Sequence, residues 1–142
     1  MSLTRAQARD EMMSTVYTPL KAYDPDFVIQ WYDDDREGRP SGRIPHAEIG
    51  VYHTAGGQVT MGNKSTNRTF RRYGYLEVLV RTPEGDGLTL ADELATIVHD
   101  ALEGVTTPGG VIFRNVRGTE EGKSGSFRTT NVSADFEYDQ IK

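Results

Sequence analysis

Residues 70–104 read FRRYGYLEVLVRTPEGDGLTLADELATIVHDALEG, and this stretch decides the fold. In its first part, 71–82, Leu76, Val78 and Val80 alternate with more polar residues. Because successive side chains of a strand point to opposite faces, this period of two predicts a half-buried β-strand. Proline and glycine follow at 83, 85 and 87, where they would end the hydrogen-bond ladder of the strand.

The second part of the stretch has the spacing of an amphipathic helix. Its apolar residues fall on one helical stripe, which comprises Leu90, Leu94, Ile97, Val98, Ala101 and Leu102. Thr89 and Asp92 have the spacing of a capping box, and Asp92 and Glu93 would face the positive end of the helix dipole. Gly104 stands where a left-handed C-terminal cap belongs. We therefore predict a strand–turn–helix unit against which the rest of the chain packs.

Composition restricts the class of protein. A chain of 142 residues is most simply one domain, here 1–142, and is long enough for a real core. The absence of cysteine removes disulfides, thiol catalysis and thiolate metal sites, and it fits a reducing compartment. No apolar run approaches the roughly 18 residues of a membrane span, and no signal-peptide core is visible at the N-terminus. We therefore expect no membrane partner.

The net charge of −5 is unevenly distributed along the chain. Residues 43–83 carry six basic and two acidic side chains, whereas residues 84–142 carry five basic and eleven acidic ones. A basic middle segment could bind nucleic acid, but the acidic chain as a whole argues against nonspecific binding. Two interpretations remain: the charges are simply solvated, or a basic surface meets an acidic surface of a neighbouring copy.

The N-terminal segment predicts a second helix. Thr4 and Gln7 have capping-box spacing, and Leu3 and Ala8 are placed for a hydrophobic staple. A modest apolar stripe follows, and Pro19 is expected to end the helix.

Four further strands are expected, at 27–32, 43–54, 111–117 and 126–139, with a loose loop at 118–125. Trp31 is expected in the core beside Phe27 and Ile29. The last strand carries one apolar face, made of Val132, Ala134, Phe136 and Tyr138. The element order α-β-β-β-α-β-β predicts an α+β fold: a mainly antiparallel sheet of about five strands with two helices packed on one face.

The connection at 55–69, AGGQVTMGNKSTNRT, is polar, contains glycine and becomes basic at its end. Hairpin loops usually have two to five residues, so a connection of this length is either disordered or functional. We interpret it as a mobile loop that becomes ordered against a partner.

Residue spacing shows no catalytic or metal-binding pattern. Gly-x-Ser-x-Gly and His-Glu-x-x-His motifs are absent from the sequence. His46 and His53 are seven residues apart on one predicted strand, so they point to opposite faces, and His99 lies on the polar side of a helix. The aspartates at 33–35 lack the spaced ligands of a calcium loop. From the residues alone we therefore expect no catalytic constellation and no metal site.

Arginine and aromatic residues alternate at the start of the central strand, as on surfaces that bind single-stranded nucleic acid. On a strand, however, Arg72 would share a face with Phe70, while Arg71, Tyr73 and Tyr75 would share the other face. Because the patch is split, we expect no sequence-specific nucleic-acid partner.

Four segments in this order resemble the tail terminator (minor tail, gpU-like) proteins of long-tailed bacteriophages and their prophages. They are HTAGGQVTMG, RRYGYLEVLVRTPEGDGLTLADELA, PGGVIFRNVR and VSADFEYDQIK, and the stretch from the first to the last, 53–142, is about two-thirds of the chain. Each segment is structural rather than chemical, so the resemblance depends on their ordered combination.

The resemblance implies a structural virion-assembly protein with an α+β fold, which is not an enzyme and requires no organic cofactor. Such a subunit forms a ring, expected to be a hexamer, at the head-proximal end of the tail tube. The ring ends tube polymerisation and forms the surface for head–tail joining. The implied partners are other copies of the chain, the tail tube protein and a head-completion or connector protein. The implied location is the virion tail, and the host cytoplasm during assembly.

The resemblance assigns roles to segments, and within them we place a hypothetical subunit or tube interface at Lys64, Arg68, Arg71, Arg72, Tyr73 and Tyr75. The 55–69 segment would contact the tube or its lumen, and the arginines would face acidic groups of a neighbour. Two other classes of protein stay open. A small ligand-binding or hydrolytic α+β domain would have a deep pocket with convergent polar groups, and a nucleic-acid-binding module would bind with steep salt dependence.

Overall fold

The computed structural model describes residues 2–31, 44–59, 68–85 and 87–141. In chain order, its elements are α1 (Arg5–Tyr23), β1 (Val28–Trp31), β2 (His46–Gln58), β3 (Thr69–Pro83), α2 (Leu88–Leu102), β4 (Ile112–Ser124) and β5 (Phe127–Ile141). This order confirms the predicted α+β class and the α-β-β-β-α-β-β sequence of elements.

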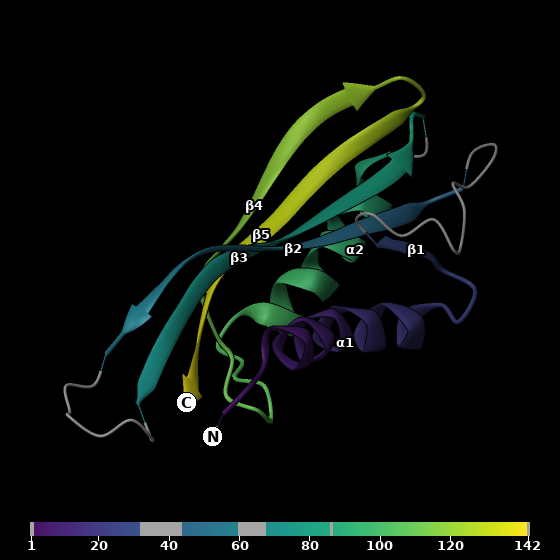
Figure 1. Cartoon of the computed structure of the whole chain (residues 1–142). Helices are drawn as coiled ribbons and strands as arrows, with labels where there is room; N and C mark the ends of the chain where they lie inside the picture. Colours follow the sequence, from purple (N-terminus) through teal and green to yellow (C-terminus); the bar gives the residue numbers. More distant parts are fainter. Residues whose placement is uncertain (1, 32–43, 60–67, 86, 142) are drawn as a thin grey trace.

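The five strands form one twisted sheet in the order β1-β2-β3-β5-β4. Figure 1 shows both helices on the same face of this sheet, as predicted, and the other face is left uncovered by helices. Three of the strand pairs are antiparallel, whereas β1 and β2 are parallel. The sheet is therefore mostly antiparallel, with one parallel pair at its β1 edge that the sequence did not predict.

The core lies between the sheet and the two helices. In β3, Leu76, Val78 and Val80 are fully buried, which confirms the period of two in the central strand. The predicted apolar face of β5 is buried as well. The helices contribute the buried residues Met12, Val16, Leu20, Leu94, Val98 and Leu102.

The start of α1 confirms the predicted capping box. The Thr4 hydroxyl accepts a hydrogen bond from the Gln7 backbone N–H at 3.2 Å, and the Gln7 side-chain oxygen accepts one from the Thr4 N–H at 3.0 Å. The predicted end at Pro19 is wrong, because α1 continues through this residue to Tyr23. The physical reason is tertiary: Leu20 is fully buried in the core, and its carbonyl accepts the capping N–H of Asp24.

The start of α2 corrects a second prediction. Gly87, with φ of 82°, is the N-cap, and no side chain caps the helix. Thr89 already lies inside the first turn, so the expected Thr89–Asp92 capping box does not form, and no acidic residue stands in that turn. At the other end, Gly104 has φ of 70°, which confirms the left-handed C-terminal cap.

Strands β2, β3 and β4 extend into segments that were predicted to be loops. Strand β2 continues to Gln58 and β3 begins at Thr69, so both strands enter the predicted 55–69 loop. Residues 60–67 of that loop lie outside the described residues, and the mobility of the loop stays a prediction. Strand β4 continues to Ser124, so the predicted loop at 118–125 is wrong for all but its last residue.

Trp31 was expected in the core and is only partly buried. Phe27 and Ile29 are buried, as predicted, whereas the Trp31 ring packs on the rim of the core. Its centroid lies 5.9 Å from that of Tyr17 on α1, in a stacked arrangement.

Candidate interface surfaces

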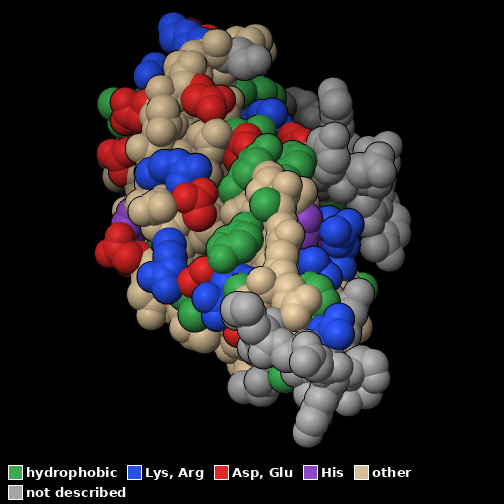
Figure 2. Space-filling model, turned by 60° about the vertical axis from the view of Figure 1, so that its left-hand side comes forward, with side chains coloured by type: hydrophobic (Ala, Val, Ile, Leu, Met, Phe, Trp, Pro, Cys, Tyr) green, Lys and Arg blue, Asp and Glu red, His purple; other side chains and the backbone are tan. Residues whose placement is uncertain are grey.

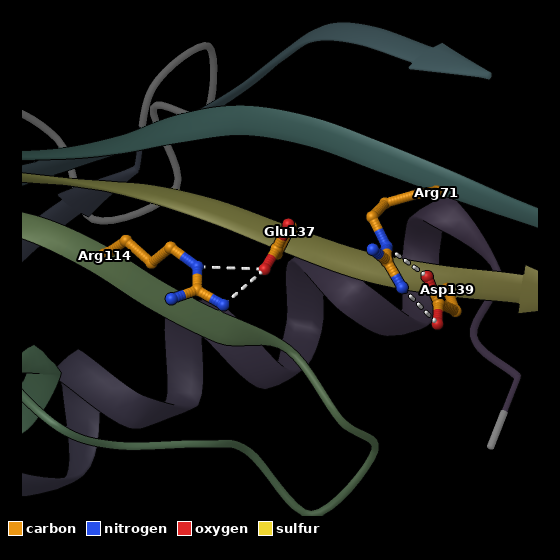
Figure 3. Close-up of polar contacts among 4 residues, drawn as sticks. All are labelled: Arg71, Arg114, Glu137 and Asp139. Atoms are coloured by element: carbon orange, nitrogen blue, oxygen red, sulfur yellow. Dashed lines mark hydrogen bonds and ion pairs between the residues drawn. The ribbon is translucent and has the colours of Figure 1, made fainter. Parts of the chain in front are cut away.

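The helix-free face of the sheet carries a row of ion pairs that connect β5 to both neighbouring strands. Arg71 on β3 donates from Nε and Nη2 to the Asp139 carboxylate at 2.9 and 3.3 Å. Arg114 on β4 donates from Nε to Glu137 at 2.9 Å. Figure 3 shows the two acidic side chains on the same face of β5, each turned toward its own arginine. The central strands of this face are therefore tied together by charge as well as by backbone pairing.

The Arg71–Asp139 contact is bidentate, which is the strongest geometry for such a pair. The hydrogen bond and the charge of Asp139 raise the pKa of the Arg71 guanidinium further above its ordinary value. Both side chains are still more than one-third exposed, at 39% and 36%. The pair therefore fixes the orientation of two side chains at the surface and leaves them accessible.

Tyrosines occupy the part of this face next to the ion pairs. Tyr75 on β3 stacks on Tyr52 of β2, with ring centroids 4.8 Å apart and planes at 24°. Tyr73 is the neighbouring residue of β3 on this face. It is 40% exposed, and its side chain is one of the large hydrophobic side chains exposed on the described surface. This face thus offers an aromatic and charged platform.

The predicted interface residues divide between the two faces of the sheet. Arg71, Tyr73 and Tyr75 share the helix-free face, where Arg71 pairs with Asp139. Arg72 points to the helix side, with its guanidinium 5.4 Å from the centre of the Phe70 ring and 3.4 Å from the Gln140 side-chain oxygen. This confirms the predicted split. Arg68 is half-buried, and Lys64 lies outside the described residues.

On the helix side, Arg72 belongs to a cluster that sequence reasoning missed. Arg5 and Arg9 on α1 and Arg72 on β3 gather around His53 and Tyr138, and we call these three residues the arginine patch. The His53 Nε2 atom lies 2.7 Å from the Tyr138 hydroxyl. The spacing of Arg5 and Arg9, four residues apart on one helical face, was a visible signal, but only the tertiary structure brings Arg72 to them.

The arginine patch carries an excess of positive charge. Burial, and then the charges of the three arginines, lower the pKa of His53 from 6.5 to about 4, so the ring is neutral near pH 7. Arg9 donates to the Val51 carbonyl at 3.3 Å, and Arg72 donates to Gln140. Within the described part of the chain, no carboxylate forms an ion pair with a residue of the patch. The patch is therefore suited to an anionic group from outside.

An acidic groove lies between the end of α1 and the start of α2. It has a volume of about 440 Å³ and is lined by Tyr23, Thr89, Asp92, Glu93, Thr96 and Ile97. The Tyr23 hydroxyl donates to Glu93 Oε2 at 3.3 Å. Asp92 and Glu93 are both exposed, and α2 contains neither lysine nor arginine. Figure 2 shows acidic and basic side chains interspersed on one side of the molecule.

The histidines lie apart, as expected. His46 is buried on the helix-free side, where its ring packs edge-on against Phe127 and burial lowers its pKa. His53 lies on the opposite face, in the arginine patch. His99 on α2 is 3.4 Å from Glu103. Across the described residues, no group of three or more histidine, aspartate or glutamate side chains is arranged to hold a metal ion.

Among known proteins, similarity to this chain is found at the level of the fold. No family model matches the chain. The curated proteins contain no match either. A solved structure whose name states no function is similar over 99% of this chain and 97% of its own length, with a TM-score of 0.69 and 17% identity. At this identity the similarity concerns the fold alone. Neither described helix is long and apolar enough to span a membrane.

Proposed function

We propose that this protein is a structural subunit of a phage or prophage tail, which forms a ring at the end of the tail tube. The ring ends tube polymerisation and offers the surface to which the head joins, in the virion and, during assembly, in the host cytoplasm. The four sequence segments that resemble tail terminator proteins motivate the proposal. The α+β fold with the expected order of elements is compatible with it.

The observation that carries the proposal is a sheet that extends beyond its helical layer. Strand β3 has 15 residues, a length of roughly 50 Å at about 3.3 Å per residue. Helix α1 has 19 residues, which is only about 28 Å at 1.5 Å per residue. Figure 1 shows the β2–β3 end of the sheet running past the helices. A subunit of this shape can place one end of its sheet against a tube while its body contacts neighbouring subunits.

A ring also needs two different surfaces on each subunit, because a cyclic interface joins one patch to a second, distinct patch. The chain offers separate surfaces of opposite charge, the arginine patch and the acidic groove. The helix-free face adds a platform that is stiffened by the Arg71–Asp139 and Arg114–Glu137 pairs. These features support a role in assembly, and this role requires no catalysis by the protein.

The proposal is tested by electron microscopy of the purified protein mixed with polymerising tail tube protein. Tubes of defined length with six-fold caps at one end are expected. Tubes that grow uncapped to indefinite length in the presence of the protein would contradict the proposal.

The hypothesis that Arg71, on the helix-free face, and Arg72, on the helix side, face a neighbouring subunit is tested separately with the double variant Arg71→Glu and Arg72→Glu, at low salt. The matched control is the exchange Arg71→Asp with Asp139→Arg, which retains an ion pair within the chain but moves the positive charge to β5. Normal ring assembly by the double charge reversal would show that these arginines do not face acidic groups of a neighbour.

A further inference from the structure

Two surfaces of opposite charge lie at opposite ends of one helix. Arg5 and Arg9 stand in the first two turns of α1, and Tyr23, its last residue, borders the acidic groove. The 19 residues of α1 separate these ends by about 28 Å. In Figure 1 this helix runs along the sheet, beginning near the N-terminus and ending on the side of β1. One end of α1 therefore carries two arginines of the patch, and its other end borders the acidic groove of α2.

The acidic groove has the chemistry of an arginine-binding site. A guanidinium group binds carboxylates through paired N–H donors and also stacks on aromatic rings. The groove supplies both, because Asp92 and Glu93 stand beside the Tyr23 ring, which is 46% exposed. Ile97 adds an apolar contact for the aliphatic part of an arginine side chain. Lysine and arginine are absent from α2, so no cation of this helix competes for the carboxylates.

The arginine patch is prepared for an acidic partner. Arg9 is oriented by its hydrogen bond to the Val51 carbonyl, and Arg72 by its contacts with Gln140 and Phe70. Arg5 is exposed and forms no hydrogen bond or ion pair with the described part of the chain. Three like charges around His53 repel one another, and an incoming carboxylate would relieve this repulsion.

We propose that the arginine patch of one copy binds the acidic groove of the next copy, with Arg5 as the residue that enters the groove. A second copy is the occupant because each surface complements the other in charge and both are present on every copy. Because the two surfaces differ, the contact is heterologous and repeats head to tail, as a ring requires. This inference deepens the proposed function and depends on it for the closure of the ring.

The experiment compares self-association of full-length variants by sedimentation velocity at low and high salt. The patch variant is Arg5→Glu with Arg9→Glu, and the groove variant is Asp92→Arg with Glu93→Arg. Each is expected to weaken association about tenfold or more, because the charges at the contact then repel. Wild-type association should weaken at high salt, where exposed charges are screened. The matched control is Asp100→Arg, an exposed site further along α2, which should associate like wild type.

Combining the variants tests whether the contact is heterologous. A chain that carries all four substitutions presents a reversed patch and a reversed groove, and it should regain self-association. In an equimolar mixture of the patch and groove variants, the wild-type groove of one meets the wild-type patch of the other, and the reversed patch meets the reversed groove. The mixture should therefore associate, although neither variant associates alone. Arg5→Glu alone is a second patch variant that should fold normally, because an acidic residue in the first turn of a helix is favourable.

The inference is wrong if wild type stays monomeric at millimolar concentration in low salt, if the single-surface variants associate like wild type, or if the fourfold variant fails to recover while folded. Tube capping by the wild type separates the two proposals. A protein that caps tubes while its patch variant still associates normally would leave the proposed function standing without this contact. Association through the patch and groove without tube capping would support this contact and contradict the proposed function.

Discussion

Gly74 offers the sharpest test of the packing around the arginine patch. It is buried in β3, between His53 of β2 and Phe136 of β5 in the sheet register. A Cβ atom at this position would collide with the Tyr52 carbonyl oxygen and would lie 2.5 Å from Cζ of Phe136. The Phe136 ring fills the space above this glycine and packs edge-on against His53 at 5.2 Å. We predict that Gly74→Ala forces β2 and β3 apart at this point.

The expected loss of stability in Gly74→Ala follows from the geometry. Overpacking a well-filled core costs about 1–3 kcal/mol, and the collision with a backbone atom places Gly74→Ala at the upper end, about 3 kcal/mol. The unfolding entropy is about 2.1 cal/mol/K per residue, so for 142 residues the melting temperature should fall by about 10 °C.

The assay is thermal unfolding followed by circular dichroism, together with urea unfolding. Gly57→Ala is the matched control, because Gly57 lies in β2 and an added Cβ there meets nothing within 4 Å. Its melting temperature should equal or slightly exceed that of wild type, since alanine in a strand costs less backbone entropy than glycine. Equal melting temperatures for the two alanine variants would refute the reasoning about close strand approach at Gly74.

Three further outcomes are expected. Thr4→Ala removes the side-chain cap of α1 and should lower the free energy of unfolding by about 1 kcal/mol; an unchanged urea midpoint would contradict this. His53 should titrate near pH 4 by NMR, and Arg9→Gln should raise this pKa. Between the folded and unfolded pKa values, only unfolded chains bind the histidine proton. The free energy of unfolding should therefore fall as the pH drops from 6.5 toward 4. A measured His53 pKa of 6.5 in the folded protein would refute the burial argument. A double-mutant cycle of Arg114 and Glu137 should give a coupling below about 1 kcal/mol, since the Arg114 side chain is 62% exposed.

Sequence reasoning succeeded where one face of an element is buried. Leu76, Val78 and Val80 alternate because one side of β3 meets the helices, and that alternation could be seen without the structure. It failed where an element has no buried face. Residues 118–124 of β4 are exposed as far as the structure describes their side chains, and they contain glycine and charged residues, so no apolar period marks them as a strand. Backbone pairing with β5 holds them in the sheet, together with the Asn131–Glu121 hydrogen bond and the Lys123–Glu84 ion pair.

Tertiary context overrode the local signal at the end of α1. Pro19 predicts a helix end, but burial of Leu20 stabilises a further turn of α1. The arginine patch was invisible for a related reason: Arg72 is 63 or more residues away from Arg5 and Arg9 in the chain, and only the packing of α1 on the sheet brings their charges to His53. The proposed interface residues Arg71, Tyr73 and Tyr75 were assigned to one face correctly because strand alternation alone decides it.

The pairing of β3 with β5 has a consequence for the order of folding. Its fifteen register pairs join two strands that are separated in the chain by α2 and β4. The β2–β3 and β4–β5 pairs each join neighbours in sequence, so their closure costs less entropy. We expect these two hairpins to form early and to dock late along β3 and β5. Substitutions in this seam should then mainly accelerate unfolding, whereas substitutions at the β4–β5 turn should slow folding.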